Sequence, residues 1–184
     1  MEPNVRSMLD DLYSPDKERQ NQAYYNLLAV TEHPVDWAYQ AWDELLAALR
    51  HKDNHIRSIA SQVLSNLAKS DPEGRMLIDF DALLAVTKDE RFVTARHCLQ
   101  SLWKIGTAGE AQRRRVVDGL TQRFHESTNE KNSTLIRYDI LEGLRRLYDA
   151  TGDESIRERA FALIETEQDE KYRKKYAGLW KGKQ

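Results

Sequence analysis

Hydrophobic residues recur along this chain at helical spacing, in runs that are separated by short polar stretches. The clearest run has its apolar side chains three or four positions apart, at Ile56, Ile59, Ala60, Val63, Leu64 and Leu67. This spacing follows the 3.6 residues of an α-helical turn and places the side chains on one buried stripe. Leu and Ala outnumber Val and Ile, and Gly and Pro are few, which also favours helices over strands.

The helical runs come in pairs, and the pairs repeat. The second run of each pair follows an Asp or Ser that can cap its first turn, at Asp16, Asp53, Asp89, Ser133 and Asp169. These starts are 37, 36, 44 and 36 residues apart, which is typical of a repeated helical hairpin. The first runs are predicted for residues 5–12, 35–49, 76–86, 116–124 and 156–164.

A single hairpin of this size cannot bury its whole apolar stripe, so neighbouring hairpins have to stack. We therefore predict an all-α fold, an α-solenoid of about five hairpins and about ten helices, with residues 1–184 as a single domain. The predicted hairpins cover residues 3–31, 35–69, 73–105, 110–149 and 153–182. The polar stretch 126–132 lengthens the fourth hairpin, and we interpret it as a loop or a disordered insertion. Gly106, Gly109 and Gly152 are expected to cap helix C-termini.

The best copy of the repeat resembles a known family. Its pattern Asp-x-x-Ile-Arg-x-x-Ala-x-x-x-Leu-x-x-Leu, at Asp53–Leu67, resembles the turn and second helix of a HEAT repeat, including the HEAT-like repeats of phycobilisome-lyase relatives. The resemblance covers nearly the whole chain, and it implies a right-handed solenoid whose second helices line a concave, ligand-binding side.

The resemblance also implies a ladder of ion pairs between successive repeats, formed by the turn Asp and the Arg that follows it. This structural role is implied for Asp53 and Arg57, and for Asp169 and Arg173. We expect the ladder to be incomplete, because the two remaining turns depart from the pattern. The departures are Ser133 in the Asp position before Arg137, and Val93 in the Arg position after Asp89.

The net charge of −2 is unevenly distributed along the chain. Residues 1–92 carry 10 Lys and Arg against 16 Asp and Glu, whereas residues 93–184 carry 18 against 14. Such asymmetry can arise by drift on solvated helix faces, and this is the simpler interpretation. It can also steer a polyanion toward the basic half.

Several features indicate a soluble protein of the cytoplasm. No apolar run reaches the roughly 18 to 20 residues that cross a bilayer, so no membrane partner is expected. Residues 1–12 lack the basic and apolar regions of a signal peptide. Cys98 is the single cysteine and lies in an apolar helical pattern, which favours an inert thiol and excludes an intramolecular disulfide framework.

The sequence contains no recognisable catalytic or metal-binding motif. It lacks a glycine-rich phosphate loop, a His-Glu-x-x-His pair, a Cys-x-x-Cys pair and a Gly-x-Ser-x-Gly turn. His51 and His55 are four residues apart, but a predicted turn separates them, so a metal site is not expected there. We predict a protein that is not an enzyme and that has no cofactor.

The candidate binding residues are those that flank the apolar stripe of the second helices, which the resemblance places on the concave side. They are Tyr25, Gln62, His97, Tyr138, Glu142, Arg145, Lys174 and Lys181. An ordinary solvated helix face is the alternative interpretation. The candidates change from neutral and polar in the first half of the chain to basic and aromatic toward its end.

Two functions remain open on this evidence. The first is a scaffold or adaptor that presents a concave helical groove to a protein or peptide partner. The second is a nucleic-acid-binding protein that is similar to the HEAT-like alkylpurine DNA glycosylases and uses Arg145, Lys174 and Lys181. No residue here matches the catalytic Asp of those enzymes. An association with chromophore lyases would rest on the repeats alone, and the oligomeric state is left open.

Overall fold

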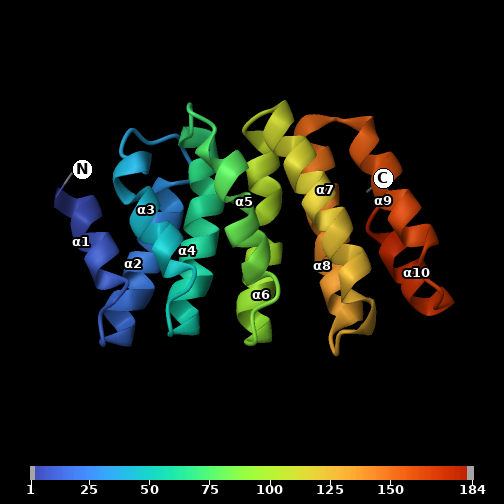
Figure 1. The fold of residues 1–184 in the computed structure, drawn as a ribbon, viewed down its shortest axis with the longest axis horizontal. Coiled ribbons are helices and arrows are strands. Elements are labelled where there is room, and N and C mark those ends of the chain that lie inside the picture. Colours follow the sequence, from blue (N-terminus) through green and yellow to red (C-terminus); the bar gives the residue numbers. More distant parts are fainter. Residues whose placement is uncertain (1–2, 182–184) are drawn as a thin grey trace. The chain divides into compact units, whose positions relative to one another are not determined.

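The computed structural model describes residues 3–181, and this part of the chain is built from helices without any strand (Figure 1). The ten α-helices are α1 (Pro3–Asp11), α2 (Lys17–Val30), α3 (Ala38–Ala48), α4 (Asn54–Leu67), α5 (Arg75–Val86), α6 (Phe92–Leu99), α7 (Glu110–Glu126), α8 (Ser133–Thr151), α9 (Glu154–Glu165) and α10 (Glu170–Gly178). Three short 3-10 helices join them, η1 (Ala68–Ser70), η2 (Leu102–Thr107) and η3 (Ser127–Asn129). The all-α prediction is confirmed, and within residues 3–181 no helix is long and apolar enough to cross a membrane.

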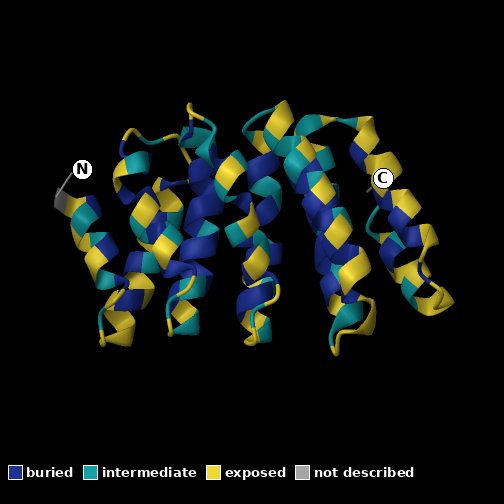
Figure 2. Cartoon of the chain, in the orientation of Figure 1, coloured by how far each residue is buried: buried dark blue, intermediate teal, exposed yellow. Residues whose placement is uncertain are grey.

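The chain divides into two compact units, which comprise residues 1–101 and 102–184. In the first unit, consecutive helices pack in pairs, α1 with α2, α3 with α4 and α5 with α6. The second members also pack on one another, because α4 contacts both α2 and α6. Their apolar stripes face inward and form the dark blue interior in Figure 2. Fully buried side chains of this core include Leu27, Trp42, Leu64, Phe80 and Leu99.

Aspartate side chains begin three of the five second helices, as expected. Asp16, Asp53 and Asp169 each accept a hydrogen bond from a backbone N–H in the first turn of α2, α4 and α10. The prediction was wrong for Asp89 and Ser133. Arg91 is the N-cap of α6, and Ser133 is the first residue inside α8, which begins at a cap without a side-chain hydrogen bond.

Charged residues also link successive hairpins of the first unit. The Arg57 guanidinium on α4 donates to both carboxylate oxygens of Asp89, over 2.6 and 2.9 Å, before α6 begins. A longer ion pair of 3.8 Å joins Lys17 at the start of α2 to Asp53 at the start of α4. Each pair connects positions about one repeat apart in the sequence.

The third hairpin departs from the predicted pattern. Its second helix was expected to continue to about residue 105, but α6 ends at Leu99 and the chain continues as the 3-10 helix η2, which belongs to the second unit. Gly106 lies inside η2 rather than at a helix C-terminus, and a Cβ atom there would lie 2.7 Å from Leu147. Gly109 precedes α7, whereas Gly152 caps α8 in the left-handed conformation, as predicted.

In the second unit, η2 packs on α7 and α8, and α8 packs in turn on α9 and α10. The stretch 126–132 is ordered rather than a disordered insertion, since it contains η3 and is tied to the core. The side chain of Arg123, which has no exposed surface, donates to both carboxylate oxygens of Glu130 over 2.6 and 2.8 Å. The buried Tyr176 donates its hydroxyl proton to the carbonyl of Thr134 and so ties α10 to α8.

Candidate binding surfaces

A row of hydrogen bonds crosses the three second helices of the first unit. Tyr24 on α2 donates its hydroxyl proton to Gln62 Oε1 on α4 over 2.9 Å. The Gln62 amide donates to the carbonyl of Ser58, and the Ser58 hydroxyl lies 3.0 Å from Nδ1 of His97 on α6. The helices bring these residues together because Tyr24 and Gln62 are 38 positions apart and Ser58 and His97 are 39 apart. These separations are close to the repeat length.

This row borders a hollow of about 180 Å³ on the face that α2, α4 and α6 present. Its lining residues are Gln20, Asn21, Tyr24, His55, Ser58, Ile59, Gln62 and His97. Amide, hydroxyl and imidazole groups dominate this lining, and no carboxylate, Lys or Arg takes part. We name this hollow with its hydrogen-bonded row the polar hollow.

The two histidines bring titratable groups to the polar hollow. Desolvation of the His97 ring, with smaller effects from Arg96 and His55, lowers the pKa of His97 below its usual range. The imidazole is therefore neutral at pH 7, and each ring nitrogen can act as donor or acceptor according to the tautomer. The His97 ring thus offers the hollow one hydrogen-bond donor and one acceptor.

The structure places two predicted binding residues, Gln62 and His97, in the polar hollow. The third one from this unit, Tyr25, is 64% exposed and lies beside it, with its ring centroid 5.0 Å from that of Tyr24. Tyr24 makes the contact across the helices instead. The sequence signal for Tyr24 is the buried pair Gln20 and Ala23, which fixes the rotation of α2.

In the second unit, the predicted binding residues lie along α8 and around α10. The ring of Tyr138 is contacted by the ammonium group of Lys175, 5.0 Å from the ring centroid. The Arg145 guanidinium donates to Asp149 over 2.7 Å and to the carbonyl of Leu179, and it stacks on the ring of Trp180 at 5.8 Å. Its hydrogen-bonding capacity is therefore partly used within the protein.

The other three predicted residues of this unit make local contacts or none. Glu142 pairs with Arg146 over 3.4 Å, and Lys174 pairs with Glu170 on its own helix over 2.7 Å. Lys181 is exposed. Within residues 102–181, no hydrogen bond or ion pair joins Arg145, Lys174 and Lys181 to one another. Lys175, the neighbour of Lys174, contacts Tyr138 but is not among the predicted binding residues.

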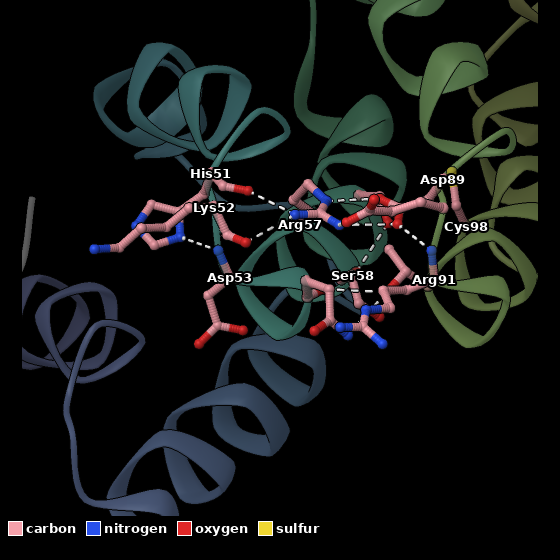
Figure 3. Close-up of polar contacts among 12 residues, drawn as sticks. His51, Lys52, Asp53, Arg57, Ser58, Asp89, Arg91 and Cys98 are labelled. Atoms are coloured by element: carbon pink, nitrogen blue, oxygen red, sulfur yellow. Dashed lines mark hydrogen bonds and ion pairs between the residues drawn. The ribbon is translucent and has the colours of Figure 1, made fainter.

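The predicted turn residues have distinct roles (Figure 3). Arg57 holds Asp89 of the next hairpin and also donates to the carbonyls of His51 and Lys52, over 2.8 and 3.1 Å. Asp53 caps α4 and pairs with Lys17. The Asp89 side chain is only 6% exposed, and this desolvation would raise its pKa, but the hydrogen bonds from Arg57 and the backbone of Arg91 lower the pKa overall.

The corresponding contacts in the second unit use different residues. Asp169 caps α10 through the backbone N–H of Lys171, and the exposed Arg173 makes no side-chain ion pair within the described residues. Arg137 instead pairs with the buried Glu167 over 2.7 Å. The inter-helix pair is therefore present here, but a Glu two residues before the predicted Asp supplies the carboxylate.

No cluster of three or more His, Cys, Asp or Glu side chains with the geometry of a metal site occurs in residues 3–181. Cys98 lies in apolar surroundings, as expected, but it is fully buried rather than half-buried, and its thiol donates to the carbonyl of Leu83. Burial raises the pKa of this thiol to about 12. The thiol is therefore protonated at neutral pH and a poor nucleophile.

These observations define an all-α protein of paired helices with a polar hollow on its first unit. Comparison with protein-family models gave no match, and no curated protein matches the sequence. Among solved structures, three engineered proteins from the Northeast Structural Genomics Consortium are similar, and each alignment covers 97% of this chain. Their TM-scores are 0.53, 0.50 and 0.51, with 17%, 17% and 18% identity over 79%, 95% and 47% of their own lengths. The likeness concerns the fold alone.

Proposed function

We propose that this chain is a HEAT-like α-solenoid that serves as a non-enzymatic binding scaffold for a peptide segment of a partner protein. The row that runs from Tyr24 through Gln62 and Ser58 to His97 carries the proposal. An extended peptide presents one N–H and one C=O group at most residues. The amide, hydroxyl and imidazole groups of the polar hollow can satisfy both kinds of group.

The contact between Ser58 and His97 invites comparison with a catalytic dyad, but its setting favours binding. A serine nucleophile needs a base that is itself oriented by a third group, commonly a carboxylate. No carboxylate contacts His97 within the described residues. In addition, Ser58 is only 7% exposed and lies inside a helix. We infer that this pair positions the two side chains for recognition.

Panning a random-peptide display library on the purified protein tests the proposal. Peptides selected on the wild type are expected to bind a Gln62→Ala/His97→Ala variant at least tenfold more weakly, a loss of about 1.4 kcal/mol. Tyr25→Ala is the matched control, because Tyr25 is exposed beside the hollow without lining it. Equal binding by the double variant would contradict the proposal, as would a library that yields no specific peptide.

Nucleic acid is the alternative ligand, and one feature of the second unit supports it. Basic groups alternate with aromatic rings there, with Lys175 on Tyr138, Arg145 on Trp180 and Lys171 on Tyr172. Residues 102–184 carry 17 Lys and Arg against 14 Asp and Glu. Aromatic and cationic side chains together suit single-stranded nucleic acid.

A titration with labelled single-stranded and duplex DNA distinguishes this alternative. Steeply salt-dependent binding that is lost in an Arg145→Ala/Lys174→Ala/Lys181→Ala variant would support nucleic acid. Absence of binding even at low salt would leave the peptide scaffold as the proposal. The buried single Cys98 is compatible with a reducing compartment, and a cytoplasmic location remains part of the proposal.

A further inference from the structure

A second hollow surface of the first unit lies between the first helices α3 and α5. It consists of two adjoining hollows of about 360 and 310 Å³ that share Arg50 and Ala82. The lining residues come only from α3, α5 and the ends that follow them, and none of them lines the polar hollow. We refer to this surface as the α3/α5 trough.

The floor and walls of the α3/α5 trough are apolar. Ala47 on α3 and Ala82 and Ala85 on α5 line the trough with small side chains, together with the buried Leu49 and Val86. Small side chains allow another helix to approach closely. At one end of the trough lies Ile78, whose side chain is 81% exposed, the largest exposed fraction of the bulky hydrophobic residues in the described part of the chain.

The rim of the trough is acidic. Asp43 and Asp79 border the end that contains Ile78, and Asp81 and Asp89 border the other end. Asp79 accepts a hydrogen bond from the Trp42 indole, and Asp89 is held by Arg57. Asp43 and Asp81 are therefore the exposed carboxylates of the rim. Arg50 is the one basic residue among the described residues that line the trough. The first unit as a whole also has a negative net charge, because residues 1–101 carry 11 Lys and Arg against 16 Asp and Glu.

We propose that the α3/α5 trough is a docking site for an amphipathic helix of a partner protein, with an apolar stripe flanked by Lys or Arg. The trough runs along α5 from Ile78 to Val86, about 12 Å at 1.5 Å per residue, which matches roughly two turns of a partner helix. A helix placed there covers Ile78 and the alanines with its apolar stripe. Its basic flanks then face the exposed Asp43 and Asp81, one at each end of the trough.

The acidic residues select this occupant over others of similar shape. Asp43 is 83% exposed, so a cation on the partner can reach it even though it also pairs with Arg75. An acidic helix would meet like charge at the exposed Asp43 and Asp81, which disfavours it. A hydrophobic helix without flanking cations would forgo the electrostatic attraction that fixes its register.

The test uses a synthetic helical peptide of Leu and Lys, with Leu at positions i, i+3, i+4 and i+7. Binding to the full chain is measured by fluorescence anisotropy at low and at moderate salt. Ile78→Asp is expected to weaken binding at least tenfold, about 1.4 kcal/mol. The matched control is Val93→Asp, which adds the same charge at a position on α6 that is 63% exposed, and it should bind within twofold of the wild type.

Two further peptides separate the contribution of the apolar stripe from that of the positive charge. A scrambled peptide of the same composition without the stripe, and a version with Glu in place of Lys, should both bind at least tenfold more weakly than the original. Equal loss in Ile78→Asp and Val93→Asp would overturn the proposal, since the effect would then not depend on the trough. Equal binding of the scrambled peptide would also overturn it, since it would show nonspecific charge attraction. Self-association of the wild type that Ile78→Asp abolishes would also overturn it, because the occupant would then be a second copy of this chain.

Discussion

Replacement of Arg57 by Met removes a buried inter-hairpin ion pair while it keeps an apolar stem of similar length. The side chains of Arg57 and Asp89 are 13% and 6% exposed, so solvent screens their contact only weakly. Removal of one partner from a buried pair costs about 3 to 5 kcal/mol, because the other charge stays buried without compensation. The backbone N–H of Arg91 still donates to Asp89, and we therefore expect a loss of about 2 to 4 kcal/mol.

Urea unfolding at pH 7, followed by circular dichroism, measures this loss. The control is Lys174→Met, which removes the ion pair with Glu170 whose side chains are 77% and 71% exposed. Exposed pairs contribute about 0 to 1 kcal/mol, so the control should be nearly neutral. Asp89→Asn and the double variant complete a cycle that isolates the coupling between the two side chains.

The difference in stability between the wild type and Arg57→Met also depends on pH. The pKa of Asp89 in the folded protein lies below its ordinary value of 3.8, so its ionised form stabilises the fold above that pH. The stabilisation is lost as the pH falls through the folded-state pKa. The difference in free energy of unfolding between the two proteins should therefore be constant near neutral pH and become smaller below about pH 4. A loss below about 1 kcal/mol at pH 7, or a gap that widens in acid, would refute the reasoning.

Three further predictions concern buried groups. Gly106→Ala should destabilise the second unit by about 1 to 3 kcal/mol in thermal unfolding, since its Cβ would lie 2.7 Å from Leu147, and Leu147→Ala should relieve part of that strain. Cys98 should react with a thiol-specific chromogenic disulfide only after denaturation, and rapid labelling of the native protein would contradict its burial. Glu130→Gln should lower the free energy of unfolding by about 1 to 3 kcal/mol, because Arg123 is fully buried; an unchanged urea midpoint would contradict this.

The spacing of apolar residues predicted the helices well because burial of one stripe is a local requirement of each hairpin. The limits of this spacing appear at α2, whose apolar run Ala23, Leu27, Leu28 and Val30 would by itself predict Leu28 and Val30 as core residues. The structure buries Gln20 in their place, since the Gln20 amide donates to the carbonyl of Leu12 over 2.7 Å, and Val30 is 39% exposed. This polar core residue rotates the helix relative to the apolar pattern and places Tyr24 on the hydrogen-bonded row.

The same ambiguity affects the shortest helices. In α10, which has nine residues, Tyr176 is the one buried side chain, so the apolar pattern barely defines the rotation. Lys174 is the predicted binding residue of this helix, but Lys175 is the residue that contacts Tyr138. The spacing of apolar residues also did not predict that α6 ends and is followed by the 3-10 helix η2. Both conformations can bury Leu102, and the close packing of Gly106 against α8 depends on a residue 41 positions away.

The stacking of neighbouring helix pairs explains why structural residues and candidate binding residues adjoin one another on α4. Arg57 fixes the start of α4 to Asp89, ahead of α6, and the next residue, Ser58, contacts His97 on α6 itself. Both contacts span about one repeat, 32 and 39 positions, so both depend on the same stacking of neighbouring hairpins. A displacement of α6 along α4 would break the charged pair and the polar row together. The charged pair therefore helps to hold the polar hollow in the arrangement that a bound peptide would meet.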